Sequence, residues 1–323
     1  MTFKIISDSS CDLDKKTLDN LDLEIFKINC VDEEGQDLSE DMSNKEIYKK
    51  MREGFFFKTS QITFYEYLKK FEKFAEEGTD IICLTLSSGL SGTYQNAWMA
   101  KKEIEEKYSI RVEIVDSLAA SVGFGQITYF AGLAAKNGAT YDEVLDLLKF
   151  LVEKTKHIFT VYDLKYLYEG GRVSRTKAKI SNVLNILPIL EVDEEGRIYL
   201  SEIVRGKNKS YKKMMEMMDE KTSSDGSDRV FPVYADDIKV IDPLIKKLEE
   251  RGYDKFLSLE VGHTIAAHVG PDIFGLAYLS ENIPEKFKKY LDWLILKLKI
   301  HKKLGSHATS FFNFLNFYNL MLF

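Results

Sequence analysis

The sequence predicts an α/β protein in which a parallel-sheet α/β/α domain is followed by a second, α+β domain. Up to about Lys156, apolar runs of strand length alternate with amphipathic helical patterns, which is typical of a parallel sheet. Beyond that point, two apolar runs flank an acidic turn and indicate an antiparallel hairpin. With 323 residues the chain is long enough for two cores. We expect domains over 1–155 and 156–280, and an extension over 281–323.

The first half contains the elements of an α/β/α layer in alternating order. Strands are expected at 3–6, 24–31, 81–86 and 112–116. Helices are expected at 13–21, 43–52, 63–77, 123–136 and 141–155, with a further helix ending near Tyr108. Ser43 and Glu46 have the spacing of a capping box, which predicts where the second helix begins.

The second half mixes a hairpin with helices. A strand at 157–161 precedes a short helix at 164–168 that ends at Gly170-Gly171. The hairpin strands are expected at 187–192 and 197–205, on either side of 193–196. Helices at 207–221 and 243–251 and strands at 229–234 and 256–261 complete the α+β pattern.

Composition indicates a soluble globular protein. Hydrophobic residues make up 45% and charged residues 30%, and the net charge of −6 argues against a nucleic-acid partner. The three cysteines lack CxxC spacing, and their odd number makes a poor disulfide framework, so we expect a reduced, cytoplasmic setting. The amino terminus enters a strand directly and does not resemble a signal peptide.

The extension differs from the rest of the chain. Residues 281–323 hold seven lysines against three acidic residues, and they end in an aromatic run at 311–318. A helix that docks on its own protein, a poorly ordered tail, and a helix that binds a partner or transiently contacts a membrane surface all fit this pattern.

The most informative stretch is the predicted strand-to-helix junction around Ser87–Thr93. Backbone N–H groups at a helix start lack intrahelical partners, so hydroxyls and glycines there make a candidate anion site. Gly89-Leu90-Ser91-Gly92-Thr93 departs from the G-x-S-x-G of hydrolases at its last position. His268 is a possible base for a nucleophilic Ser91, but no aspartate is marked out as its partner. A serine at a helix start also serves as an ordinary N-cap.

Three further clusters carry polar groups without a catalytic signature. They are the hydroxyls Thr59 and Ser60, Arg172 after two glycines, and His268 before a Gly-Pro turn. Arginine suits a carboxylate or phosphate, but it also forms ordinary surface ion pairs. His263 and His268 alone make a weak metal site, and no Walker motif is present, so no metal or other cofactor is expected. Together the clusters favour binding a carboxylate over cleaving a bond.

Five short motifs occur in a fixed order along the chain. They are Ser7-Asp8-Ser9, Thr59-Ser60-Gln61, Ser87 to Gln95, Gly171-Arg172-Val173-Ser174 and His268-Val269-Gly270-Pro271. In this order they resemble the DegV family of bacterial fatty-acid-binding proteins, which serve a fatty acid kinase. The resemblance spans about residues 3–280.

The resemblance implies a carrier that is not itself an enzyme. It holds a long-chain fatty acid, and a kinase phosphorylates the bound carboxylate. The implied carboxylate ligands are Thr59, Ser60, Ser91, Gly92 and His268. Arg172 and Arg205 are implied to face the head group or the kinase.

Two positions depart from the family pattern, and one alternative function stays open. Ile62 stands where a proline is common, and Asp272 replaces the second glycine of Gly-Pro-Gly, which places a negative charge near the expected carboxylate site. The alternative is a serine esterase or acyl-transfer enzyme that uses Ser91 and His268. A protein-interaction module that depends on the basic extension is a third hypothesis.

Overall fold

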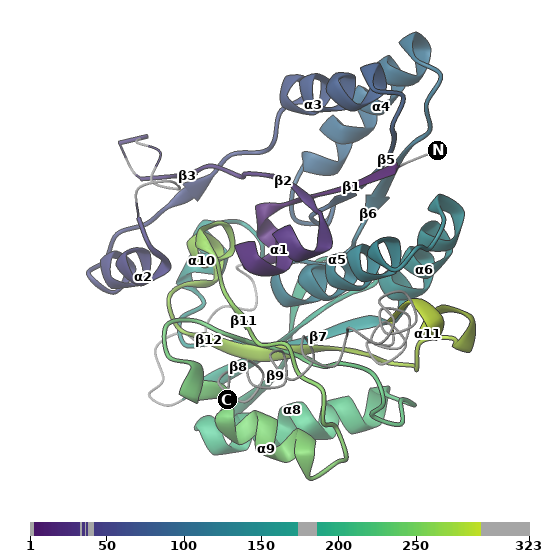
Figure 1. Ribbon diagram of the computed structural model, residues 1–323. Coiled ribbons are helices and arrows are strands. Elements are labelled where there is room, and N and C mark those ends of the chain that lie inside the picture. The colour runs from purple at the N-terminus through teal and green to yellow at the C-terminus, as the bar shows by residue number, and fades with distance from the viewer. Residues whose placement is uncertain (1–2, 33, 36, 38–41, 174–185, 292–323) are drawn as a thin grey trace, which may run out of the picture.

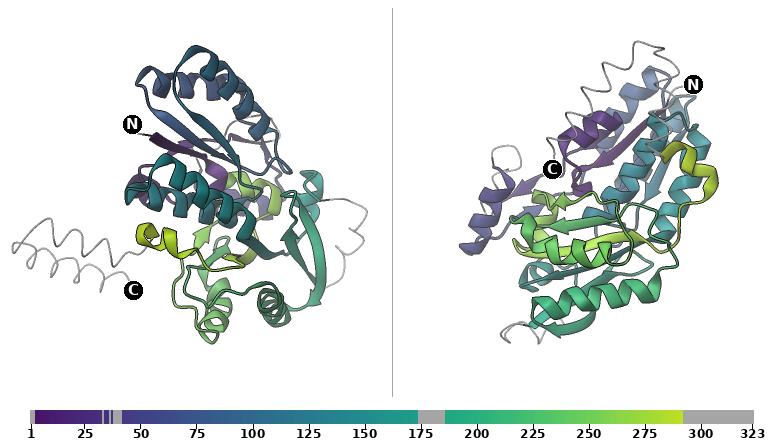
Figure 2. Two further views of the ribbon diagram at one scale, coloured as in Figure 1. Left: turned by 90° about the vertical axis from the view of Figure 1, so that its right-hand side faces the viewer. Right: turned by 60° about the horizontal axis from the view of Figure 1, so that its bottom comes forward.

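Two large β-sheets and three helical layers make up the described part of the fold, beside a small two-stranded sheet. The computed structural model describes residues 3–32, 34, 35, 37, 42–173 and 186–291. From the top of Figure 1 downward, the layers are α3 and α4, the first sheet, α1, α5 and α6, the second sheet, and α8 with α9. The views in Figure 2 show the same stacking. The predicted fold class is confirmed.

The first sheet is parallel throughout, with strand order β2-β1-β5-β6. Its strands are β1 (Phe3–Asp8), β2 (Glu24–Phe26), β5 (Asp80–Thr85) and β6 (Val112–Asp116). The helices of this half are η1 (Ser9–Cys11), α1 (Lys15–Leu21), α2 (Asn44–Arg52), α3 (Phe64–Glu76), α4 (Thr93–Lys107), α5 (Ser121–Lys136) and α6 (Tyr141–Lys154). The expected capping box of Ser43 and Glu46 is present at the start of α2.

The second sheet has strand order β11-β10-β12-β7-β8-β9 and is antiparallel except for the pair β10 and β11. Its strands are β7 (Thr155–Val161), β8 (Ile186–Val192), β9 (Ile198–Arg205), β10 (Phe231–Tyr234), β11 (Leu259–Glu260) and β12 (Ile273–Leu279). The helices here are α7 (Lys165–Glu169), α8 (Lys207–Lys221), η3 (Ile238–Ile241), α9 (Asp242–Glu249), α10 (His263–Val269) and α11 (Glu285–Leu291).

One predicted strand is divided in the structure. The apolar run at 24–31 forms β2 in the first sheet and then leaves it to form β3 (Cys30–Val31). β3 pairs with β4 (Lys58–Thr59) as a separate two-stranded antiparallel sheet. This departure carries Thr59 away from the first sheet and toward α10.

Helix α5 joins the cores of the two sheets. Nearly all of its side chains are buried, because it packs on β1 of the first sheet and on β7, β10 and β12 of the second. One hydrophobic cluster therefore contains residues of both halves, such as Ile82 of β5 and Val233 of β10. The expected division of the chain at residue 155 stays a prediction.

The start of the basic extension is part of the folded molecule. Phe287 and Tyr290 of α11 are buried against α5, and the Tyr290 hydroxyl donates to Glu143 at 2.6 Å. Residues 292–323, which include the aromatic run, lie outside the described residues. Within the described part of the chain, no helix has the length and apolar content to cross a membrane.

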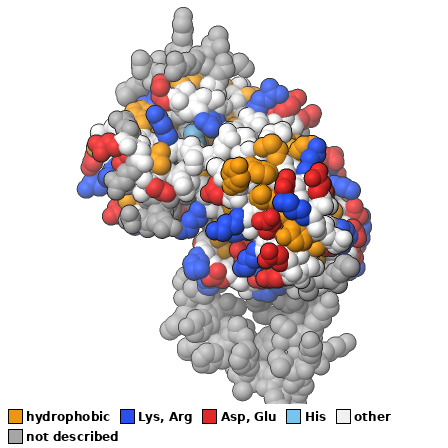
Figure 3. Space-filling view, turned by 90° about the horizontal axis from the view of Figure 1, so that it is seen from above, with side chains coloured by type: hydrophobic (Ala, Val, Ile, Leu, Met, Phe, Trp, Pro, Cys, Tyr) orange, Lys and Arg blue, Asp and Glu red, His pale blue; other side chains and the backbone are white. Residues whose placement is uncertain are grey.

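The face above α3 and α4 is mixed in character. Figure 3 shows acidic and basic side chains interspersed there, with hydrophobic side chains between them. Tyr65, Trp98 and Met99 are among the exposed large side chains of these helices.

Candidate functional site

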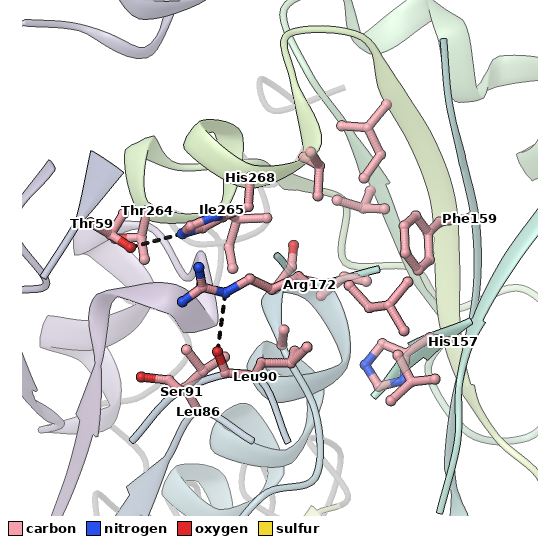
Figure 4. Close-up of a pocket in the computed structure, with 18 of the residues that line it drawn as sticks. Thr59, Leu86, Leu90, Ser91, His157, Phe159, Arg172, Thr264, Ile265 and His268 are labelled. Carbon is pink, nitrogen blue, oxygen red and sulfur yellow. Dashed lines mark hydrogen bonds between the residues drawn. The ribbon is translucent and has the colours of Figure 1, made fainter. Parts of the chain in front are cut away.

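A largely apolar cavity lies between the two halves, at the end of β5 and beside α10. Its volume is about 70 Å³, and 13 of its 21 described lining residues are apolar. Polar side chains gather at one end, which we call the polar end and define by Thr59, Ser91, Arg172 and His268 (Figure 4). An apolar space with a few convergent polar groups is the usual form of a small-molecule site.

Ser91 reaches the cavity from the loop between β5 and α4. Its hydroxyl lies 3.0 Å from the Thr93 hydroxyl and accepts a bond from the Thr93 backbone N–H at 3.3 Å. Ser91 therefore lies at the positive end of the fifteen-residue helix α4, where an anion is stabilised. The loop is fixed to the second half, because the Ser87 hydroxyl donates to the Gly196 carbonyl at 2.8 Å.

Thr59 and His268 approach the cavity together from different elements. The Thr59 hydroxyl and His268 Nε2 are 2.8 Å apart. Thr59 is held by pairing with Cys30 in the β3–β4 sheet, and His268 lies in the last turn of α10. Residues 209 positions apart in the sequence thus form one hydrogen-bonding unit.

Arg172 supplies the positive charge of the polar end. Its Nε donates to the Leu90 carbonyl at 3.2 Å, and its Nη1 donates to the Gly170 carbonyl. Among the described residues, no carboxylate lies within ion-pair distance of it, and burial lowers the pKa of its guanidinium. A half-buried cation without a carboxylate partner is unfavourable unless an anion joins it. Figure 4 shows the guanidinium between His268 and Ser91.

His268 is neutral in this environment. Burial and, to a smaller extent, the positive charge of Arg172 lower its pKa to about 4. Its Nδ1 atom is buried and has no hydrogen-bond partner among the described residues. A neutral histidine can donate one hydrogen bond and accept another, so it suits orienting a ligand oxygen or the Thr59 hydroxyl.

The three remaining predicted site residues lie in different places relative to the cavity. Ser60 lines the cavity beside Thr59. Gly92 does not line it, and it precedes the first residue of α4. Arg205 is exposed at the far end of β9, about 23 Å along the strand from the lining residue Ile198. Structure therefore brings Thr59, Ser60, Ser91, Arg172 and His268 together but leaves Arg205 apart.

Asp272 does not place its charge in the cavity. Its Oδ1 accepts from Arg52 Nη2 at 2.8 Å, and Arg52 Nη1 donates to Asp236 at 2.7 Å. Asp272 is not among the lining residues. The ion pair with Arg52 of α2 therefore keeps the Asp272 carboxylate outside the site.

Sequence reasoning missed His157, Ser121 and Thr264, which also line the cavity. His157 is buried within β7, and burial lowers its pKa to about 4. A histidine inside a predicted buried strand was the available signal for it. Ser121 and Thr264 had none, because they enter the cavity through the positions of α5 and α10 in the fold. In the described part of the chain, no group of three or more metal-ligating side chains could hold a metal ion.

Comparison with known proteins agrees with this geometry. A family profile described as "Uncharacterised protein, DegV family" matches residues 2–281. The chain belongs to the DegV family. The resemblance inferred from the five sequence motifs is therefore confirmed. Ser174, the last residue of one of those motifs, lies outside the described residues.

Several DegV-family relatives are described as binding lipids. A "Fatty acid-binding protein" of Thermotoga maritima is 34% identical over 286 residues, which cover 85% of this chain and 96% of the relative. A DegV-family protein of Thermus thermophilus, whose structure is described as showing fatty acid binding, has a TM-score of 0.78 at 27% identity, with 87% and 100% of the two chains covered. A stearic acid-binding protein of Eubacterium ventriosum also has a TM-score of 0.78, at 25% identity, with 90% and 99% covered.

Proposed function

We propose that this protein binds a long-chain fatty acid, with its carboxylate at the polar end and its acyl chain in the apolar part of the cavity. The observation that carries this proposal is Arg172, a half-buried guanidinium without a carboxylate partner among the described residues. A carboxylate bound there would accept from the arginine and from the hydroxyls of Thr59 and Ser91. The fatty acids bound by relatives support the same ligand class.

Chain burial would supply most of the affinity. Each methylene removed from water contributes about 0.8 kcal/mol, so a long acyl chain outweighs the few hydrogen bonds at its head. The lining leucine, isoleucine and valine side chains provide that environment. The polar end then fixes which way the ligand points.

The arrangement around Ser91 favours a carrier over a serine esterase. A nucleophilic serine needs a base within hydrogen-bond reach and a third group that orients the base. His268 Nε2 contacts the Thr59 hydroxyl, whereas the Ser91 hydroxyl contacts Thr93. His268 Nδ1 lacks a partner among the described residues, so no carboxylate orients the ring. We therefore propose that the protein does not itself turn over its ligand.

We further propose that the bound fatty acid is presented, in the cytoplasm, to a fatty acid kinase that forms the acyl phosphate. Phosphoryl transfer to a carboxylate requires a nucleotide and metal ions, which a kinase partner would bring. Arg205 is exposed and distant from the cavity, and this position suits contact with a partner protein. Arg172 would face the head group.

Analysis of the natural ligand tests this function. The protein is purified without detergent, extracted with organic solvent and examined by mass spectrometry for fatty acids. We expect a long-chain fatty acid in near-stoichiometric amount, and a higher melting temperature when oleate is added to delipidated protein. The absence of both results would overturn the carrier hypothesis. Labelling of Ser91 by a fluorophosphonate probe would favour the esterase instead.

A further inference from the structure

A second hollow begins where the cavity ends. This groove has a volume of about 820 Å³ and lies among β6, α6, the start of β7 and the turn after β8. His157 and Val192 line both the cavity and the groove. Side chains that border both spaces form the wall between them.

The wall closes the end of the cavity that lies away from the polar end. β7 and β8 are antiparallel, with Ile158 opposite Glu191, so the next position along this register sets His157 opposite Val192. Figure 4 shows His157 and Phe159 on the other side of the pocket from Thr59 and Ser91.

His157 is held firmly in this position. One ring nitrogen bonds to the backbone of Ala120, and burial keeps the imidazole neutral at pH 7. The ring also packs directly on α5 at Gly123, where an added Cβ would lie only 1.9 Å from Nε2. A glycine is therefore needed at this turn of α5 for the ring to fit, and the ring has little room to move aside.

The groove beyond the wall could accept more of an apolar chain. Its lining includes the apolar side chains of Leu118, Leu145, Leu148 and Val152, while eight of its eighteen described lining residues are charged. A chain that passed the wall would thus meet apolar surface that is open to water on one side.

We propose that His157 and Val192 set the longest acyl chain that the protein accepts, by ending the cavity before the groove. The inference rests on the proposed binding of fatty acids. Affinity should rise about fourfold for each added methylene until the methyl end reaches the wall. Longer chains should then bind no better, or more weakly, because the extra carbons have no apolar space to enter.

The test measures affinity across a series of saturated acids from lauric to behenic. Delipidated wild-type protein is compared with His157→Ala and Val192→Ala, each of which opens the wall, and melting temperatures confirm folding. Leu145→Ala is the matched control, because Leu145 lines the groove but not the cavity. We expect each opened variant to prefer a longer acid than wild type does. Its affinity for the first acid longer than the wild-type optimum should be about tenfold higher than that of wild type. The control should keep the wild-type optimum.

The possible outcomes distinguish the proposed length limit from the proposed binding of fatty acids. If wild type binds fatty acids but both opened variants keep its length preference, His157 and Val192 do not limit chain length, and the carrier function is unaffected. A shift that also appears in Leu145→Ala would assign the limit to the groove and overturn the proposal. If wild type binds no acid of the series, the carrier function fails and the wall fails with it.

Discussion

At the residue scale, the polar end depends on side chains whose hydrogen bonds are incomplete within the protein. Arg172 uses two of its N–H groups on carbonyls, and His268 leaves Nδ1 without a partner among the described residues. Groups left in this state cost stability, and a bound carboxylate would recover part of that cost. The polar end is thus suited to an anionic oxygen.

Replacing Ser91 tests the contribution of one hydroxyl. A hydrogen bond to a charged group contributes about 1.5 kcal/mol or more, so Ser91→Ala should weaken fatty-acid affinity about tenfold. Global unfolding should change little, because the Ser91 side chain bonds only to Thr93 among the described residues. Titration calorimetry and thermal melts measure the two effects.

Ser88→Ala is the matched control for this change. Ser88 lies in the same loop but does not line the cavity. Equal affinities for wild type and Ser91→Ala would remove Ser91 from the set of ligands. Equal losses in Ser91→Ala and Ser88→Ala would assign the effect to the loop as a whole.

His157 should make stability depend on pH. Its pKa is about 4 in the folded protein, below the ordinary value of 6.5, because burial disfavours the charged ring. The unfolded chain then binds more protons between these values, so the contribution is present above pH 6.5 and is lost as pH falls toward 4. Between pH 7 and pH 5, the free energy of unfolding of wild type should fall by about 2 kcal/mol more than that of His157→Leu.

Denaturant unfolding of both proteins at several pH values measures this difference. Asp12 acts in the opposite direction, because burial raises its pKa to about 7, but it is common to both proteins and cancels in the comparison. Parallel pH profiles for the two proteins would show that His157 is not the titrating group.

At the element scale, α10 carries His268 and ends at a glycine that no other residue would replace easily. Gly270 has φ +86°, and a Cβ there would lie 2.6 Å from Cδ2 of Tyr166 in α7. Gly270→Ala should therefore destabilise the protein by about 2 kcal/mol. It should also weaken fatty-acid binding, because the end of α10 would move and displace His268.

Gly252→Ala separates backbone strain from the collision with Tyr166. Gly252 also has a positive φ, +89°, but an added Cβ there has no atom within 4 Å. We expect a smaller loss of stability, about 1 kcal/mol, and unchanged affinity. If both variants bind fatty acid like wild type, the position of His268 does not depend on the end of α10.

Elements with local signals were predictable, and those defined by pairing partners were not. The capping box at Ser43 and the parallel strands of the first sheet follow from spacing and periodicity within short windows. β12, which lies between β7 and β10, was not predicted, although its uniformly buried run has the same character as that of β5. The run at 24–31 was predicted as one strand, because nothing local shows that Cys30 pairs with Thr59.

The site was predictable to a similar extent. The motifs identified Thr59, Ser91, Arg172 and His268 as candidates, and the structure brings these four together. His157 required knowledge of which face of β7 meets α5. The role of Asp272 required the position of Arg52 on α2, 220 residues earlier in the chain.

At the scale of the whole molecule, the cavity is built where both halves meet, so ligand and fold should stabilise each other. Its lining comes from the loop between β5 and α4 and the start of α5 on one side, and from β7, α10 and β12 on the other. A ligand present at a hundred times its dissociation constant adds about 2.7 kcal/mol to the free energy of unfolding. This coupling makes the melting temperature a direct readout of binding for every variant above.

The folded part of the chain includes the first residues of the basic extension. The family profile ends at residue 281, but α11 continues the fold to Leu291 through Phe287 and Tyr290. Removing residues 285–323 should therefore cost several kcal/mol, since each buried aromatic side chain contributes about 2 kcal/mol. Removing residues 292–323 leaves both aromatic rings in place.

Comparing these two truncations decides whether the extension takes part in fatty-acid binding. The DegV family profile matches residues 2–281, so it does not include the extension. We therefore expect the chain ending at Leu291 to bind oleate as the full chain does, and the chain ending at Pro284 to melt at a lower temperature. Calorimetry measures the oleate affinity of each chain. A clear loss of affinity in the chain that ends at Leu291 would instead give residues 292–323 a part in ligand capture. It would also favour the hypothesis that the extension contacts a partner or a membrane surface.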